Sequence, residues 1–252
     1  MRRKLAAGNW KMNGLRADLA EIEAISAAMG LSPDPAARAE VLLCPPSTLL
    51  MNAADIAQGR VAIGGQNCHR LPFGPHTGDI SGPMLIDAGA SHVILGHSER
   101  RMDHRETDAK VREKALYAHS IGLVTVICLG ETAEDHDLGQ TVRIVGRHLQ
   151  HSLPEDATAA NTVVAYEPIW AIGSGKTPTP AQIAEVHGFM RTQLIERFGA
   201  EGEGMRLLYG GSVKPGNAAE IFAVPEVDGA LVGGASLTAR DFLPIVEALE
   251  RS

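Results

Sequence analysis

The stretch TVVAYEPIWAIGSGKTPTPAQIAEVHGFMRTQLIERF, residues 162–198, contains the structural unit from which the chain is built. It opens with a short apolar, β-branched run, which is typical of a strand buried on both faces of a parallel sheet. Further on, Thr179, Pro180 and Gln182 supply a threonine N-cap, a proline at the first helical position and a glutamine at the third, the pattern of a capping box. The stretch therefore predicts a strand, a long loop and a helix that begins after Thr179.

The same alternation runs through the whole chain. Seven further runs are expected strands: KLAAGN from residue 4, EVLLC from 40, VAIGG from 61, HVILG from 92, LVTVIC from 123, RLLYG from 206 and DGALVGG from 228. Three more amphipathic stretches are expected helices, at residues 17–29, 107–120 and 241–250. Eight strands alternating with helices in 252 residues predict an α/β fold, a (β/α)8 TIM barrel that forms one domain over residues 1–252. An open doubly wound sheet is the alternative, but it usually has fewer strands.

Composition and charge indicate which binding partners and which cell compartment to expect. The formal net charge is −7 and no run of Lys or Arg occurs, so neither nucleic acid nor an anionic membrane is an expected main partner. No apolar segment is long enough for a membrane span, and the N-terminus lacks the apolar core of a signal peptide. The three cysteines are far apart in sequence, which favours reduced thiols in a cytoplasmic protein.

The segment GSGKT, residues 173–177, is similar to the end of an ATP-binding P-loop. A P-loop, however, needs a glycine five positions before Gly175, where this chain has Trp170. Pro178 also disfavours a helix at Thr177, although a P-loop helix should begin there. An ATPase is therefore disfavoured.

Polar residues and glycines collect directly after the expected strands. Asn9 and Lys11 follow the first strand, His97 and Glu99 the fourth, and Glu167 the sixth. Glycine turns follow the seventh and eighth strands, at residues 210–211 and 233–234. Active sites of TIM barrels lie at these strand ends, and the last two loops often bind phosphate. The sequence therefore predicts a site with an acid, an imidazole, an ammonium group and a phosphate-binding turn.

The motifs at these strand ends resemble those of the triosephosphate isomerase family. They are GNWKMNG (residues 8–14), GGQN (64–67), GHSERR (96–101), CLGE (128–131), AYEPIWAIGSGK (165–176), YGGSV (209–213) and DGALVGGASL (228–237). All seven occur in order from one end of the chain to the other.

The resemblance implies a role for each matching position. Glu167 would be the base that moves a proton between two carbons, and His97, as a neutral imidazole, would polarise the substrate carbonyl. Lys11, with Asn9 beside it, would balance negative charge, and Glu99 would orient Lys11. The remaining implied positions are phosphate-binding amides of Gly173, Ser212, Gly233 and Gly234, a lid that begins at Pro168 and ends with Lys176, and Thr77 in a loop that reaches a partner subunit.

The chemistry explains why such residues would be needed. A carboxylate with an ordinary pKa of about 4.3 is a weak base, and burial under a lid raises its basicity. Ile172 and Leu231 are the apolar candidates for covering Glu167. A closed lid also excludes water from an enediol phosphate, which otherwise loses its phosphate group. The reaction requires no metal and no organic cofactor, and the resemblance implies a triose phosphate substrate and a homodimer.

The chain departs from the family pattern in two places. Met102, Asp103, His104 and Arg105 replace an aromatic pair and a glycine, and His76 stands where an apolar or aromatic residue is more usual. Apart from His97, the histidines show no convincing spacing for metal ligation, and the charged run at residues 100–110 suggests a solvated helix face.

Two alternative functions are compatible with the same barrel fold. One is an isomerase of a four-carbon ketose phosphate, and the other is a non-catalytic barrel that binds phosphosugars. The second is disfavoured because Glu167, His97 and Lys11 are all present.

Overall fold

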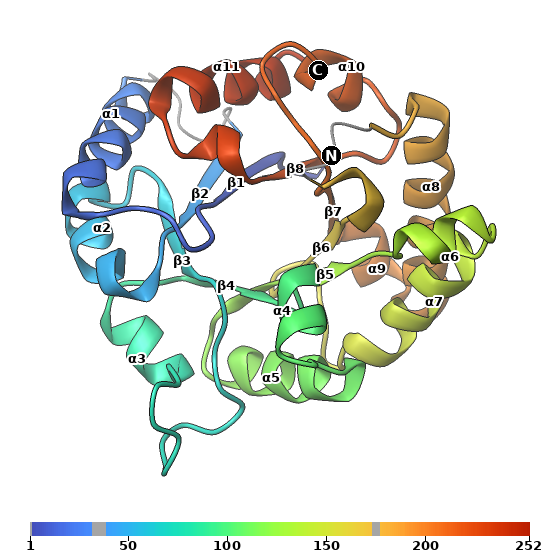
Figure 1. The fold of residues 1–252 in the computed structure, drawn as a ribbon, viewed down its shortest axis with the longest axis horizontal. Helices are drawn as coiled ribbons and strands as arrows, with labels where there is room; N and C mark the ends of the chain where they lie inside the picture. The colour runs from blue at the N-terminus through green and yellow to red at the C-terminus, as the bar shows by residue number, and fades with distance from the viewer. Residues whose placement is uncertain (1, 32–38, 173–176) are drawn as a thin grey trace.

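The computed structural model describes residues 2–31, 39–172 and 177–252. Eight parallel strands form a closed barrel in the order β1 to β8, and β1 pairs with both β2 and β8 (Figure 1). The strands are β1 Leu5–Asn9, β2 Glu40–Cys44, β3 Ala62–Gly65, β4 His92–Leu95, β5 Val124–Leu129, β6 Thr162–Tyr166, β7 Arg206–Tyr209 and β8 Gly229–Val232. The predicted TIM barrel is confirmed, and each strand lies within or overlaps the run that predicted it.

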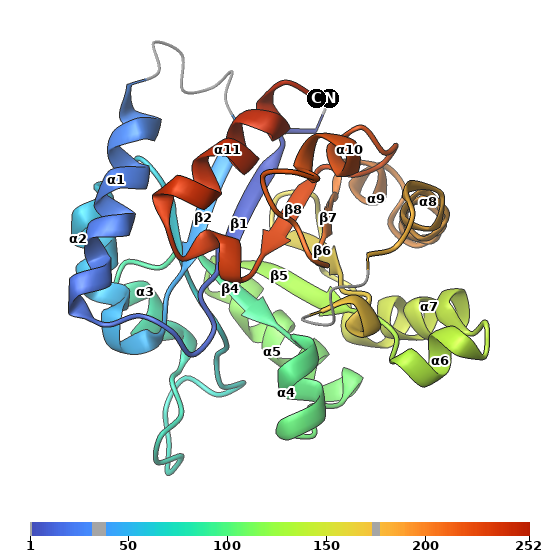
Figure 2. The same cartoon turned by 45° about the horizontal axis from the view of Figure 1, so that its top comes forward.

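Helices surround the barrel (Figure 1). The longer ones are α1 Leu19–Gly30, α2 Leu50–Ala57, α5 Asp108–Ser120, α7 Thr141–Ser152, α8 Pro180–Phe198 and α11 Ala239–Glu250. The shorter ones are α3 Gly82–Asp87, α4 Ser98–Asp103, α6 Ala133–Asp137, α9 Ala200–Gly204 and α10 Ala218–Phe222, with 3-10 turns η1 Arg16–Asp18, η2 Ser47–Leu49, η3 Ile169–Ala171 and η4 Gly234–Ser236. Helix α11 contacts both α1 and β1, so the last helix closes the ring beside the first (Figure 2).

Local sequence explains where these helices begin. The Thr179 side chain accepts from the backbone N–H of Gln182, and the Gln182 side chain accepts from that of Thr179, which confirms the predicted capping box of α8. Helix α11 begins two residues earlier than expected because the Thr238 side chain accepts from the backbone N–H of Asp241. The stretch expected to be helical from residue 17 begins instead as the turn η1, and α1 starts only at Leu19.

The strands are buried on both faces, as their apolar runs predict. Inside the barrel, one set of side chains forms its own cluster: Leu5, Ala7, Leu42, Cys44, Ile94, Val126, Cys128, Val163, Ala165, Leu208 and Leu231. The alternate side chains, such as Leu43 and Val164, join a larger layer between strands and helices. All three cysteines are buried free thiols.

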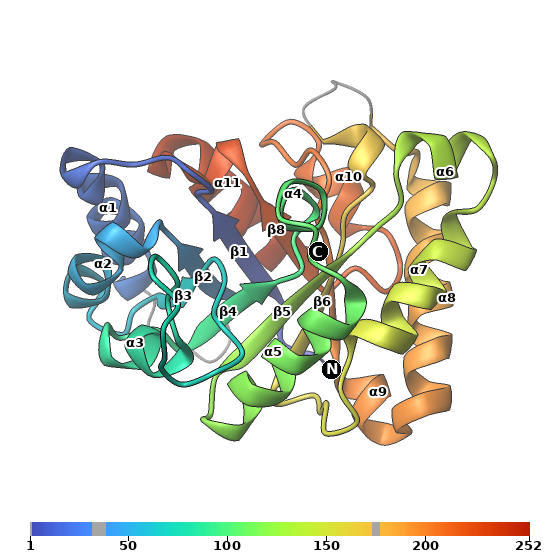
Figure 3. The same cartoon turned by 60° about the horizontal axis from the view of Figure 1, so that its bottom comes forward.

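The connections that leave the carboxyl ends of the strands lie at one end of the barrel. Helix α4 follows β4 there, and the turns η3 and η4 follow β6 and β8 (Figure 3). The connection between β3 and α3 is long and extends away from the barrel (Figure 1). Active sites of TIM barrels lie at this end.

Candidate active site

His97 and Glu167 form the centre of the site. Nε2 of His97 lies 2.9 Å from Oε1 of Glu167, and both side chains are buried. The other carboxylate oxygen of Glu167 accepts a hydrogen bond of 3.0 Å from the backbone N–H of Ser98. The structure thus brings together the two residues predicted to be base and electrophile, although they are 70 positions apart in sequence.

Helix α4 determines the orientation of the imidazole. His97 is its N-cap, and Nδ1 of His97 accepts from the backbone N–H of Glu99 at 3.3 Å. Because Nδ1 is the acceptor, the proton of a neutral imidazole is carried by Nε2 and points at Glu167. The imidazole can therefore donate a hydrogen bond into the site without being charged.

Burial and pairing act in opposite directions on the pKa values of Glu167 and His97. Desolvation raises the pKa of Glu167, but His97 and the amide of Ser98 outweigh it and hold the pKa below its usual value. Desolvation lowers the pKa of His97, but the neighbouring charges of Glu167 and Glu99 outweigh it and raise the pKa. In the unliganded site, each group therefore stabilises the charged form of the other.

Lys11 points into the same site from the loop after β1. Its Nζ lies 2.7 Å from Oε1 of Glu99, as predicted for a residue that orients it. The backbone of Lys11 has φ of 54°, a conformation that L-residues rarely adopt. The Asn9 side chain accepts from the Lys11 N–H at 3.0 Å, and the Gln66 side chain donates to the Lys11 carbonyl at 2.8 Å. These bonds hold Lys11 in its strained conformation.

A cavity of about 700 Å³ lies over these groups. Of the predicted residues, its lining contains Asn9, Lys11, His97, Glu167, Ile172, Ser212, Leu231, Gly233 and Gly234. The glycine turn after β8 leads into η4 and lines the same cavity as Lys11, so its backbone N–H groups are available there. The predicted lid residues Gly173 and Lys176 lie outside the described residues.

One protein family matches almost the whole chain. The family model described as triosephosphate isomerase matches residues 4–249. The chain belongs to the triosephosphate isomerase family.

Individual relatives match over nearly their full length. The chain is similar to a triosephosphate isomerase of Ruegeria pomeroyi, with 61% identity over all of this chain and 99% of the relative. It is also similar to one of Xanthobacter autotrophicus, with 56% identity over 98% and 97% of the two chains. The crystal structure of triosephosphate isomerase from Bartonella henselae has a TM-score of 0.90 and 49% identity, with 98% of each chain covered.

Glu131, a buried acid for which the sequence predicts no role, contacts residues at the start of the expected lid. Oε1 of Glu131 accepts from Trp170 Nε1 at 2.8 Å and from the Tyr166 hydroxyl at 3.1 Å. The His136 ring stacks on the Trp170 ring, with centroids 4.1 Å apart. Burial raises the pKa of Glu131, and these hydrogen bonds offset it only in part. Pro168, the first residue of the expected lid, is buried as well.

Two glycines also position Glu167 in a way that motif reading did not show. A Cβ atom on Gly130 would lie 1.7 Å from the carbonyl oxygen of Glu167, and one on Gly210 would lie 2.8 Å from its Cγ. Only glycine allows the neighbouring strand ends to approach this closely. The register of β5 with β6, in which Leu129 pairs with Tyr166, creates the first contact.

The charged run at residues 100–110 is mainly exposed, as expected of a solvated face. It is split between α4 and α5, and two of its members are drawn inward. The Arg101 guanidinium donates to the Gly96 and Cys128 carbonyls, and Glu106 is buried against Arg100 and Lys114. The charge pattern alone did not reveal these tertiary partners.

Two further predictions concern Thr77 and membrane spans. Thr77 is exposed in the long connection between β3 and α3. None of the helices within residues 2–31, 39–172 and 177–252 has both the length and the apolar character that a membrane span needs.

Proposed function

We propose that this chain interconverts dihydroxyacetone phosphate and D-glyceraldehyde 3-phosphate through an enediolate. The observation that carries the proposal is the buried pair of Glu167 and His97, with Lys11 facing the same cavity. Abstraction of a proton beside a carbonyl needs a base and an electrophile on the two sides of the substrate. This pair supplies both.

Glu167 takes the proton. Its carboxylate removes a proton from the carbon that carries the hydroxyl group, and the C–H electrons form the carbon–carbon double bond of the enediolate while the carbonyl electrons move to oxygen. The former carbonyl oxygen gains the proton that the neighbouring hydroxyl group loses. The protonated Glu167 then delivers its proton to the former carbonyl carbon as the other oxygen becomes the new carbonyl, so no proton is consumed overall. The amide of Ser98 and the close packing of Gly130 hold the carboxylate in place for both transfers.

His97 and Lys11 stabilise the charge that develops on oxygen. The neutral imidazole presents its Nε2 proton, because Nδ1 is occupied as an acceptor. The substrate oxygen would replace the Glu167 carboxylate as the partner of that proton. Lys11, oriented by Glu99, adds a fixed positive charge, and Asn9 maintains the backbone conformation from which Lys11 projects.

The phosphate group would lie against the glycine turns that follow β7 and β8. We assign it to backbone N–H groups of Ser212, Gly233 and Gly234, joined by Gly173 when the lid closes. The lid begins at Pro168 and ends with Lys176, and Ile172 and Leu231 would cover the base when water is excluded. Binding of the phosphate would thereby contribute to catalysis at the reacting carbons.

We further propose one domain over residues 1–252, a cytoplasmic location and a homodimer. Several large apolar side chains near the active-site end of the barrel support the dimer, because they are exposed in one chain: Met12, Phe73, Met84 and Met102. Thr77 lies in the connection that would reach the partner subunit.

The test is a coupled isomerase assay on purified protein with both triose phosphates and a four-carbon ketose phosphate. We expect the higher kcat/KM with the triose phosphates. A preference for the four-carbon substrate would replace this proposal with the rival isomerase, and turnover at the background rate would leave only a binding function.

A further inference from the structure

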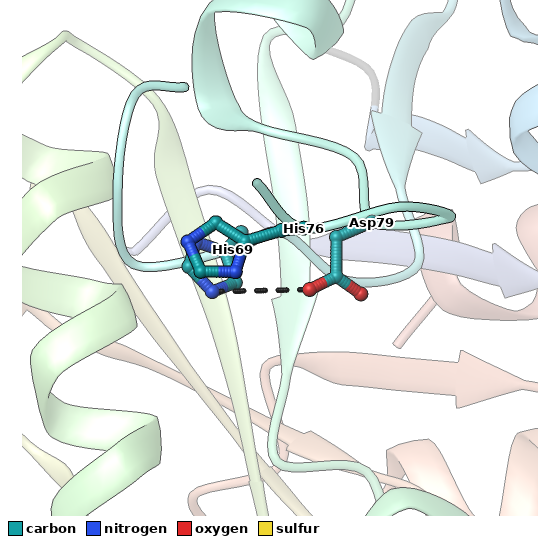
Figure 4. A group of neighbouring side chains, drawn as sticks. All are labelled: His69, His76 and Asp79. Atoms are coloured by element: carbon teal, nitrogen blue, oxygen red, sulfur yellow. Dashed lines mark ion pairs between the residues drawn. The ribbon is translucent and has the colours of Figure 1, made fainter. Parts of the chain in front are cut away.

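A second group of chemically active side chains lies outside the cavity, in the connection between β3 and α3. His69, His76 and Asp79 each present one ligand atom, and these atoms all lie within 4.8 Å of one another (Figure 4). Among the described residues, this is the one group of three or more His, Cys, Asp or Glu side chains with such spacing. The proposed isomerase reaction uses none of the three.

The geometry points to a binding site for a divalent transition metal ion. We propose that His69, His76 and Asp79 bind one ion of the zinc type and thereby fasten the connection that carries Thr77. Two imidazoles and one carboxylate form a common ligand set for such ions, with a fourth position left to water.

The ligand atoms are already close to the required distances. Nε2 of His69 lies 3.8 Å from Oδ2 of Asp79, and the two imidazole rings have centroids 4.0 Å apart. Tetrahedral bonds of about 2.0–2.1 Å place neighbouring ligand atoms about 3.4 Å apart, so no pair has to close by more than about 1.4 Å. Rotation of side chains that are partly exposed can supply this movement.

The backbone holds the three residues together before any ion binds. The N–H of His69 donates to the Ile80 carbonyl at 2.7 Å, and His69 forms a bridge with Ser81. The N–H of Asp79 donates to the His76 carbonyl at 3.0 Å. These bonds close the connection at its base, so the ion has to order only three side chains.

One hydrogen bond must change when the ion binds. Nδ1 of His69 accepts from the Leu71 N–H at 3.1 Å, which assigns the proton of the neutral ring to Nε2. Ligation through Nε2 moves that proton to Nδ1, so the Leu71 amide has to turn to solvent. Leu71 is exposed, which makes this exchange possible.

Two nearby cations are paired with other acids. Arg70 pairs with Glu113 at 3.1 Å, and Lys114 pairs with Glu106. Asp79 thus remains the carboxylate that faces the two imidazoles (Figure 4). Its oxygen supplies the negative charge that favours a divalent cation over a neutral ligand.

The experiment titrates ZnCl2 into metal-free full-length protein at pH 7.5, monitored by calorimetry, with MgCl2 as the hard-ion comparison. We expect one zinc ion per chain, weak or no magnesium binding, and an increase of the thermal midpoint with zinc. His76→Phe keeps an aromatic ring against His69 but removes a ligand, and Asp79→Asn keeps the shape but removes the charge. Each should weaken zinc binding at least about 10-fold and abolish the thermal shift.

His104→Gln is the matched control, because His104 is an exposed histidine that lines a neighbouring cavity with His69 and Asp79. It should bind zinc as the wild type does. Zinc affinity that is unchanged in both His76→Phe and Asp79→Asn, or lost in His104→Gln, would overturn the proposal. Absence of zinc binding to the wild-type protein would overturn it as well.

Discussion

Nε2 of His97 lies 2.9 Å from Oε1 of Glu167 inside a site where both side chains are almost fully buried. Two strands far apart in the sequence, β4 and β6, deliver these groups to the same cavity. In the absence of substrate each group is the hydrogen-bonding and charge partner of the other. The buried carboxylate remains charged because it has this partner. A bound carbonyl would separate them and leave each facing a different part of the substrate.

Shortening Glu167 tests whether its position matters. Glu167→Asp withdraws the carboxylate by about one bond length, and a misplacement of about 1 Å can cost on the order of 100-fold in rate. We expect kcat to fall by about that factor while KM changes far less, because the phosphate contacts remain. Steady-state kinetics on both triose phosphates measure this. An unchanged kcat would exclude Glu167 as the base.

Gly130→Ala tests the position of the Glu167 carboxylate by displacing the backbone of Glu167. The new Cβ would lie 1.7 Å from the Glu167 carbonyl oxygen, so β5 or β6 has to shift and carry the carboxylate with it. We expect a loss of about 100-fold in kcat, as for the shortened side chain. Gly188→Ala, on α8 with no atom near its added methyl group, should retain wild-type kinetics. Equal activity of the two variants would contradict this account.

The barrel could be predicted from sequence because strands buried on both faces need apolar runs, and the runs here are nearly continuous. The site residues followed from the same rule: Asn9, His97 and Glu167 lie at or just after strand ends, and strand ends meet at one end of a barrel. Position along the chain was sufficient for these residues.

Other features depended on strand register and tertiary packing. The contact of Gly130 with Glu167 arises from how β5 pairs with β6, which no local pattern encodes. Glu131 is the last residue of a recognised motif, but it has its partners on the next strand and turn. His69 and His76 are seven residues apart, a spacing typical of no regular ligand motif, and they meet only because the connection folds back on itself.

Trp170→Phe tests the anchor at the start of the lid. The phenyl ring can still stack on His136, but Glu131 loses the 2.8 Å hydrogen bond from Nε1. Loss of a hydrogen bond to a buried carboxylate should lower the free energy of unfolding by about 1–3 kcal/mol in urea titrations.

The matched variant is Glu131→Gln, alone and together with Trp170→Phe. A double-mutant cycle should give a coupling energy of about 0.5–3 kcal/mol if the two side chains interact as the structure has them. Strictly additive effects would mean that this contact does not stabilise the start of the lid.

The buried His187 makes stability depend on pH. Burial lowers its pKa from 6.5 to about 4, with Arg191 adding to the effect and the Glu226 carbonyl opposing it. Between these two values the unfolded chain takes up a proton that the folded chain excludes, so stability is complete above pH 6.5 and falls as the pH drops toward 4. One such proton changes the free energy of unfolding by at most about 1.4 kcal/mol per pH unit. His187→Phe keeps a ring against Tyr166 and removes the proton site, so its stability should decline less steeply over this window.

Urea titrations at pH 7, 6 and 5, at one protein concentration, measure how steeply the stability of the wild type and of His187→Phe declines. His151→Phe, at an exposed position on α7, should keep the wild-type slope. If His187→Phe also keeps it, other groups such as His92 and His148, whose pKa values are likewise lowered to about 4, account for the acid sensitivity.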